Sequence, residues 1–199
     1  MLARLFGGLA VAAGVMLSAV GISHANQSWD PGNRFDMGAP SGRSNFNLFG
    51  GSGPVARSVV MLQGNHAPGT IIVNTTERRL YYVLGNGQAI RYGIGVGRIG
   101  FTWSGVKTVT AKKEWPDWTP PSQMLRRRPD LPRFMKGGPD NPLGARAMYL
   151  GSTLYRIHGS NEPETIGEAV SSGCFRLTNE DVVDLYNRVR VGAKVIVLR

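Results

Sequence analysis

Short apolar runs separated by glycine and asparagine turns make up most of the chain after Gly69. Short runs rich in β-branched and aromatic residues are typical of strands, and turn formers between them favour hairpins. One later stretch repeats its apolar residues at helical spacing after Thr178, a residue type that caps helices. The pattern predicts a mainly β domain, an antiparallel sheet or barrel, with strands at residues 70–73, 79–84, 88–93, 107–112 and 194–198 and a helix at 179–189.

Residues 115–145 break this pattern with repeated prolines, which fix φ and remove backbone donors. We therefore expect a long proline-rich loop without regular structure. An ordered insert of this length is usually a functional loop or a lid. Trp115 and Trp118 lie within it. They either pin the loop to the core, the interpretation we favour, or line a substrate groove.

The first residues of the chain predict export. Arg4 supplies a positive charge, residues 5–22 carry no charge, and Ser23 and Ala25 place small residues where a signal peptidase cuts. We expect a signal peptide over residues 1–25 that is cleaved after Ala25. An uncleaved membrane anchor is the alternative, because the apolar run is almost long enough to span a bilayer.

Residues 26–68 are rich in turn formers and show no strand or helix period, apart from a possible short strand near 58–62. This segment is predicted to be a flexible linker. The folded domain is then expected to cover residues 69–199.

The chain is strongly basic, with 23 lysines and arginines against 13 acidic residues and a formal charge of +10. Removal of the signal, whose only charge is Arg4, leaves 10 − 1 = +9. Because an exported protein does not meet nucleic acid, we expect no nucleic-acid partner, and membrane contact only through the signal segment. An anionic polymer or surface outside the cytoplasm fits the charge, and the alternative is that the charge only maintains solubility.

Two patterns of binding residues are present only in part. Gly95, Gly97 and Gly100 have the spacing of a dinucleotide-binding loop, but the residues that follow are typical of a strand or a turn, whereas that loop must open a helix. His66 and His158, with one cysteine, make a poor zinc ligand set after signal removal. We therefore expect neither a metal nor a cofactor.

Cys174 is the single cysteine, so it forms no internal disulfide. A lone thiol in an oxidising compartment is expected to be either buried or used. His158 precedes it by 16 residues, and Gly159 and Gly173 allow close backbone approach beside both residues. An imidazole that takes the proton of a thiol makes it a nucleophile, and backbone N–H groups near Gly173 could stabilise an oxyanion. The alternatives are a structural thiol and a hydrogen-bonded sheet histidine.

This part of the chain resembles the signature of the L,D-transpeptidases of the YkuD type. The resemblance rests on His158-Gly159, on residues 171–177 (SSGCFRL) with Asn179 and Asp181, and on residues 137–146 (GGPDNPLGAR). It covers residues 70–198, about two-thirds of the chain.

The resemblance implies a β-sandwich or capped barrel with one or two short helices. Cys174 would attack the carbonyl after meso-diaminopimelate in a peptidoglycan tetrapeptide stem and release D-alanine. An amine of a second stem would resolve the acyl-enzyme into a 3→3 cross-link, or an envelope protein would supply the amine. The expected compartment is the periplasm of a Gram-negative bacterium.

The resemblance also assigns roles around Cys174. His158 would be the base, with its ring oriented by the carbonyl of Gly159. Gly173 and Ser172 would contribute to the oxyanion site, while Arg176, Ser171 and Tyr155 would bind substrate. Many members carry a second histidine where this chain has Ser172, so His158 is the only candidate base in the motif.

Two other functions remain open from the sequence. Water could replace the acceptor amine, which would make the protein a peptidoglycan L,D-carboxypeptidase or amidase. The basic surface and the tryptophans of the loop could instead belong to a non-catalytic wall-binding module in which Cys174 only packs.

Overall fold

A computed structural model of the chain describes residues 55–199. The predicted signal peptide and residues 26–54 of the predicted linker lie outside this part. Within residues 55–199, no helix is long and apolar enough to span a membrane.

Strands dominate the described residues, which confirms the prediction of a mainly β fold with few helices. The helices are α1 (Ser122–Arg127), the 3₁₀ turn η1 (Pro163–Thr165) and α2 (Asn179–Arg188). The strands are β1 (Ser58–Met61), β2 (Ile71–Asn74), β3 (Arg79–Gly85), β4 (Gln88–Gly93), β5 (Val96–Gly97), β6 (Gly105–Glu114), β7 (Arg146–Leu150), β8 (Arg156–His158), β9 (Ala169–Ser171), β10 (Phe175–Arg176) and β11 (Lys194–Leu198).

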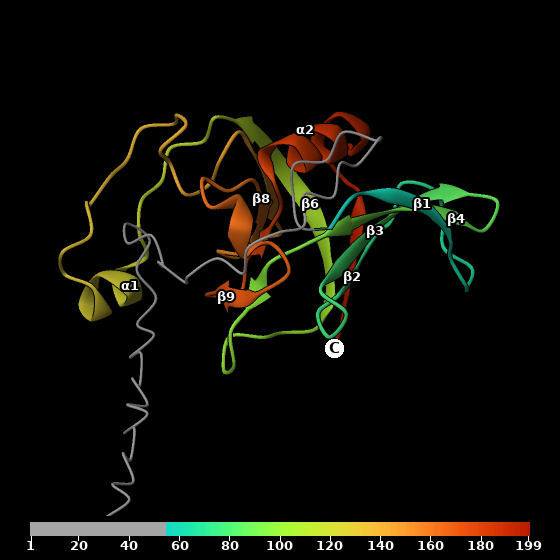
Figure 1. Cartoon of the computed structure of the whole chain (residues 1–199), viewed down its shortest axis with the longest axis horizontal. Coiled ribbons are helices and arrows are strands. Elements are labelled where there is room, and N and C mark those ends of the chain that lie inside the picture. The colour runs from blue at the N-terminus through green and yellow to red at the C-terminus, as the bar shows by residue number, and fades with distance from the viewer. Residues whose placement is uncertain (1–54) are drawn as a thin grey trace, which may run out of the picture.

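Nine strands form one continuous sheet in the order β1-β4-β3-β2-β11-β6-β7-β8-β10, and β5 pairs with β9 separately. The long strand β6 belongs to both halves of the sheet (Figure 1). Its first residues pair with β11, its later residues pair with β7, and the register shifts between Val109 and Ala111. The shift lets one strand change partners as the sheet bends.

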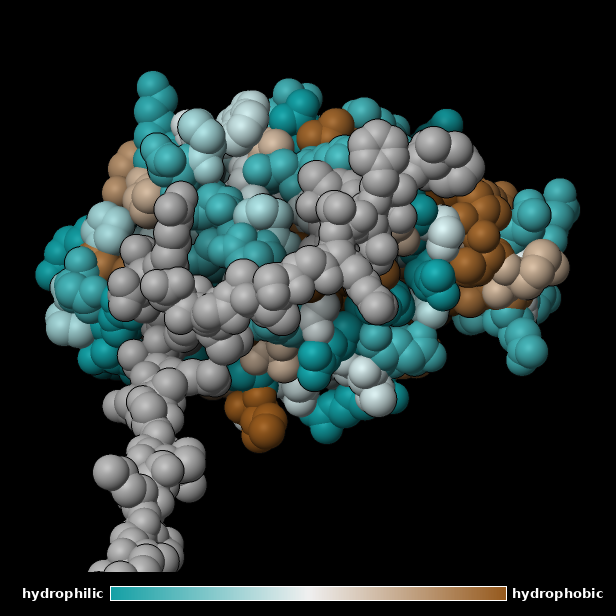
Figure 2. Space-filling view, in the orientation of Figure 1, coloured by the Kyte–Doolittle hydropathy of each residue, from teal (hydrophilic) through white to brown (hydrophobic). Residues whose placement is uncertain are grey.

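The sheet begins before Gly69, the residue at which the sequence pattern places the start of the folded part. Strand β1 pairs antiparallel with β4, with Ser58 opposite Arg91. It is an outer strand, and Val59 and Met61 remain 59% and 74% exposed. Figure 2 shows an apolar area over this end of an otherwise largely hydrophilic face.

The core lies between the sheet and α2. Strand residues such as Ile71 and Leu80 are fully buried, and α2 adds Val182 and Leu185 from its apolar face. Burial of this apolar surface is the main driving force that holds the helix on the sheet.

The proline-rich loop contains a short helix, α1, so the prediction that it lacks regular structure is wrong for residues 122–127. Pro121 precedes the helix and Pro129 follows it, so no proline removes a donor from its interior. Trp118 is 6% exposed and packs with Met124, Leu131 and Leu143 in a second apolar cluster. The loop is therefore pinned by Trp118, whereas Trp115 is 43% exposed.

We expect the cap of α2 to contribute measurably to stability. Thr178 Oγ1 accepts the backbone N–H of Asp181 at 3.1 Å. Thr178→Ala should lower the free energy of unfolding by about 1 kcal/mol, measured by urea denaturation. Thr178→Ser keeps the acceptor oxygen and should lie closer to the wild type. Equal losses in both variants would assign the effect to the buried methyl group instead of the cap.

Candidate active site

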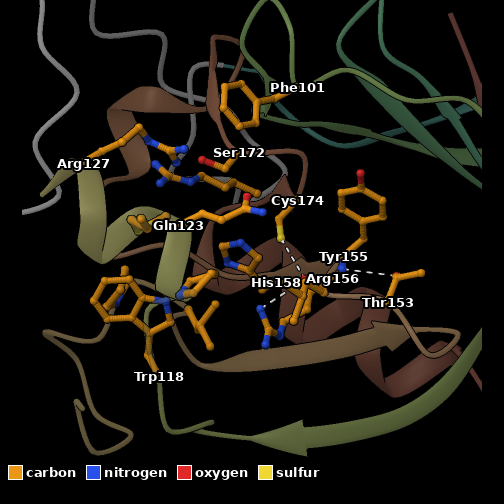
Figure 3. A pocket seen from close by; sticks show the side chains of 16 residues that line it. Phe101, Trp118, Gln123, Arg127, Thr153, Tyr155, Arg156, His158, Ser172 and Cys174 are labelled. Carbon is orange, nitrogen blue, oxygen red and sulfur yellow. Dashed lines mark hydrogen bonds between the residues drawn. The ribbon is translucent and has the colours of Figure 1, made fainter. Parts of the chain in front are cut away.

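Cys174 and His158 meet because β8 and β10 are adjacent parallel strands. Ile157 pairs with Phe175, and His158 pairs with Arg176. Ile157 and Phe175 are buried in the core, so the alternation of a strand turns their neighbours to the opposite face. Cys174 directly precedes β10, and it shares that face with His158, diagonally across the pair and within side-chain reach. Figure 3 shows both side chains in one cavity.

The ring of His158 is held by the next residue in the chain. Its Nδ1 lies 2.6 Å from the carbonyl oxygen of Gly159. A carbonyl can only accept, so Nδ1 carries the proton and Nε2 keeps its lone pair for the cavity. A Cβ at residue 159 would collide with Asn179 Oδ1, which accepts the N–H of Ala145 at 2.8 Å. The orienting residue therefore has to be glycine.

Burial keeps this imidazole neutral. His158 is 4% exposed, and this loss of solvent, with a smaller contribution from the charge of Arg176, lowers its pKa to about 3. Hydrogen bonds to the carbonyls of Gly159 and Leu143 act in the opposite direction. His158 is therefore available as a base throughout the neutral range.

The thiol of Cys174 is also neutral at rest. Burial raises its pKa, and the nearby Arg156 opposes this rise. Its S–H donates to the carbonyl of Leu154 at 3.6 Å. The pair is thus a neutral thiol and a neutral imidazole, so the proton has to move when the sulfur reacts.

Ser171 holds the turn that leads into Cys174. Its hydroxyl donates to the carbonyl of Cys174 at 2.6 Å and accepts the N–H of Gly173 at 3.1 Å. Ser171 is 2% exposed and is not among the described residues that line the cavity, which differs from the expectation that it binds substrate. The N–H of Gly173, expected at the oxyanion site, is engaged within the turn, and the N–H of Cys174 is the better candidate.

Trp103 is a site residue that sequence reasoning missed. Its Nε1–H donates to the carbonyl of Gly173 at 2.8 Å, and its ring stacks on Tyr155 with centroids 4.5 Å apart. Gly173 has a φ of +107°, and a Cβ there would lie 2.7 Å from the Tyr155 ring. The indole therefore fixes the peptide plane between Gly173 and Cys174. The only sequence signal was an aromatic residue in the turn after the glycine-rich bend.

The cavity has a volume of about 370 Å³. Arg127, Arg156 and Arg176 line it, and none of its described lining residues is acidic. Arg176 is almost fully buried, and its guanidinium lies 3.1 Å from Glu162. Ser172 Oγ is buried and makes no hydrogen bond within residues 55–199. The cavity is therefore positively charged, and Cys174 forms part of its wall.

Tyr155 also lines this cavity, as expected of a substrate-binding residue, whereas His66 does not. Trp118 lines one wall in addition to pinning the loop. In the described part of the chain, no group of three or more histidine, cysteine or acidic side chains could hold a metal ion.

Known proteins with similar sequences share this domain. A family model of the YkuD L,D-transpeptidase catalytic domain matches residues 68–197. The Probable L,D-transpeptidase ErfK/SrfK of Escherichia coli (strain K12) is 42% identical over 137 residues, which are 64% of this chain and 43% of that protein. The chain thus spans less than half the length of this curated relative.

Two solved structures are similar to this fold. L,D-transpeptidase 3 from Mycobacterium tuberculosis superposes with a TM-score of 0.52 at 20% identity over 65% of this chain and 60% of that one. A Brucella melitensis protein, described as a probable carnitine operon oxidoreductase, is 46% identical with a TM-score of 0.50, over 73% of this chain and 94% of that one.

The glycine-rich stretch at 95–100 does not form a dinucleotide-binding loop. Val96–Gly97 is the short strand β5, and the following turn closes with the N–H of Phe101 on the carbonyl of Arg98 at 2.9 Å. A dinucleotide loop would instead open a helix at this point. The match to the family model over residues 68–197, together with relatives about 40% identical, shows that the chain belongs to the L,D-transpeptidase family with a YkuD-type catalytic domain.

Proposed function

We propose that this chain is an L,D-transpeptidase that transfers an acyl group from peptidoglycan tetrapeptide stems through Cys174. The observation that carries the proposal is the shared face of β8 and β10. There a thiol lies beside an imidazole whose Nδ1 is held by Gly159 at 2.6 Å. Membership of the family supports the same assignment.

In the first half of the reaction, Nε2 of His158 takes the proton of the thiol as Sγ bonds to the scissile carbonyl carbon. The carbonyl electron pair moves onto oxygen, where the N–H of Cys174 and the hydroxyl of Ser172 stabilise it. The tetrahedral intermediate then collapses and breaks the bond after meso-diaminopimelate. His158 returns the proton to the departing D-alanine amine, and a thioester remains on Cys174.

In the second half, an acceptor amine gives a proton to His158 and attacks the thioester carbonyl. The thiolate leaves and recovers the proton, which completes the cycle. A stem-peptide amine yields a 3→3 cross-link, and an envelope protein amine would anchor that protein to the wall. Water in the same position would yield the hydrolytic alternative.

Other features of the site suit this chemistry. Arg176, braced by Glu162, keeps positive charge beside the reacting atoms, and Tyr155 forms an apolar wall next to Cys174. We further propose a signal peptide over 1–25, a linker from residue 26 to β1, a catalytic domain that extends the predicted range 69–199 to include β1, and a periplasmic location. The reaction as written needs no cofactor.

The first test is incubation of the purified protein with tetrapeptide-bearing muropeptides. We expect cross-linked dimers from the wild type, none from Cys174→Ala and far fewer from His158→Ala. The loss in His158→Ala should be about 10²- to 10⁴-fold with an unchanged circular dichroism spectrum. Tripeptides without dimers would support hydrolysis.

Intact-protein mass after incubation with a carbapenem should show one adduct, and its absence would indicate a non-catalytic wall-binding module.

The second test is the pH dependence of Cys174 alkylation by iodoacetamide, followed by mass spectrometry. Because burial raises the pKa of the thiol, the thiolate is the minor form at neutral pH and grows tenfold per pH unit. The logarithm of the rate should rise with a slope near one from about pH 6 to about pH 8.5. The depressed pKa of His158, about 3, adds no step in this range. A pH-independent rate below neutrality would instead reveal a resting thiolate–imidazolium pair.

The third test concerns Trp103. Attack on a carbonyl creates an oxyanion that the N–H of Cys174 must meet, whereas alkylation of sulfur creates none. Trp103→Phe removes the hydrogen bond to Gly173 and keeps an aromatic ring against Tyr155. We expect carbapenem acylation to slow by about 10- to 100-fold and alkylation to change by about twofold or less. Trp115→Phe makes the same change at an exposed position and should alter neither rate. An equal fall in both reactions would contradict this role.

A further inference from the structure

We infer that Arg127 forms a carboxylate-binding subsite in the cavity of Cys174, and that it recognises the free carboxylate of the leaving residue. The inference rests on the proposed function, because that carboxylate belongs to the acyl donor. Arg127 lies in the last turn of α1, within the proline-rich loop. Its side chain reaches across the cavity toward Ser172 (Figure 3).

The other two arginines of the cavity bind oxygen atoms of the protein through their guanidinium groups, whereas Arg127 does not in the described part of the chain. Arg176 pairs with Glu162 at 3.1 Å, and Arg156 donates to the carbonyl of Leu154 at 3.2 Å. Within residues 55–199, Arg127 contacts neither a carboxylate nor a carbonyl, and its guanidinium carbon lies 5.4 Å from the centre of the Phe101 ring. Its five N–H donors therefore remain for a ligand.

A second cation lies beside it. The guanidinium carbon of Arg98 is 4.5 Å from the centre of the same Phe101 ring. Burial lowers the pKa of Arg98, and the positive charge of Arg127 lowers it further. The two cations therefore repel one another. An anion bound to Arg127 would offset this repulsion, and a guanidinium matches the two oxygens of a carboxylate in a planar, bidentate contact.

The position of the subsite selects one carboxylate of the donor. Arg127 and Cys174 line the same cavity of about 370 Å³, so the ligand group has to lie close to the reacting carbonyl. In a tetrapeptide stem, the carboxylate of the terminal D-alanine is three bonds from that carbonyl carbon. An additional residue on the stem would convert this carboxylate into a neutral amide, so the subsite would favour four-residue stems over longer ones.

The helix itself provides a matched control. Arg126 and Arg127 both lie in the last turn of α1, where a positive charge favours the helix end. Both are exposed, but only Arg127 is among the cavity-lining residues. A role in holding the helix would be common to both arginines, whereas a role in recognising the donor belongs to Arg127 alone.

The test compares two donors in the wild type, Arg127→Gln and Arg126→Gln. One donor is the tetrapeptide stem, and the other is the same stem with a C-terminal carboxamide. We expect the wild type to prefer the carboxylate donor by about 10- to 100-fold in kcat/KM. Arg127→Gln should remove this preference by slowing the carboxylate donor alone, and Arg126→Gln should keep it. This is a double-mutant cycle in which the substrate carries one of the changes.

Each outcome of the cycle has one meaning. Equal losses for both donors in Arg127→Gln would assign Arg127 to the structure of the loop and overturn the subsite. A wild type that uses both donors equally would overturn it without any variant. A wild type that turns over neither donor and whose Cys174 resists carbapenem would overturn the proposed function itself, and the subsite with it.

Discussion

The parallel pairing of β8 with β10 is the constraint on which the site depends. The pairing buries Ile157 and Phe175 in the core, and strand alternation then places His158 and Cys174 on the opposite face. The geometry of the pair is thus fixed by apolar burial on the other side of the same two strands. A shift of one residue in this register would place Cys174 and His158 on opposite faces of the sheet.

The same burial sets the chemistry of the pair. A desolvated imidazole with a pKa of about 3 stays neutral, and a thiol with a raised pKa does so as well. At rest, Cys174 and His158 are therefore both uncharged, and the charge of the cavity comes from the arginines that line it. In the proposed mechanism, charge develops only when a carbonyl is present to receive the sulfur, so the thiol stays neutral until substrate binds.

Features encoded by nearby residues could be predicted from the sequence. The strands follow from apolar periodicity, and the Cys174–His158 pair follows from a local motif with flanking glycines. The remaining features depend on contacts between distant segments. Trp103 reaches Gly173 across 70 positions, and the commitment of Ser171 to its own turn appears only in three dimensions. The sequence pattern does not predict helix α1, because prolines crowd both sides of residues 122–127 although none lies inside them.

The position of β11 has a consequence for how the protein is made. This strand follows every other strand in the sequence, yet it lies inside the sheet between β2 and β6. Until β11 is available, β6 and the site-bearing strands beyond it cannot join the half that contains β2 and β3. A partly synthesised chain therefore lacks the strand that joins the two halves of the sheet. Folding has to wait until β11 pairs with β2, which lies far away in the sequence. Such a chain therefore stays without its complete sheet until β11 has been synthesised.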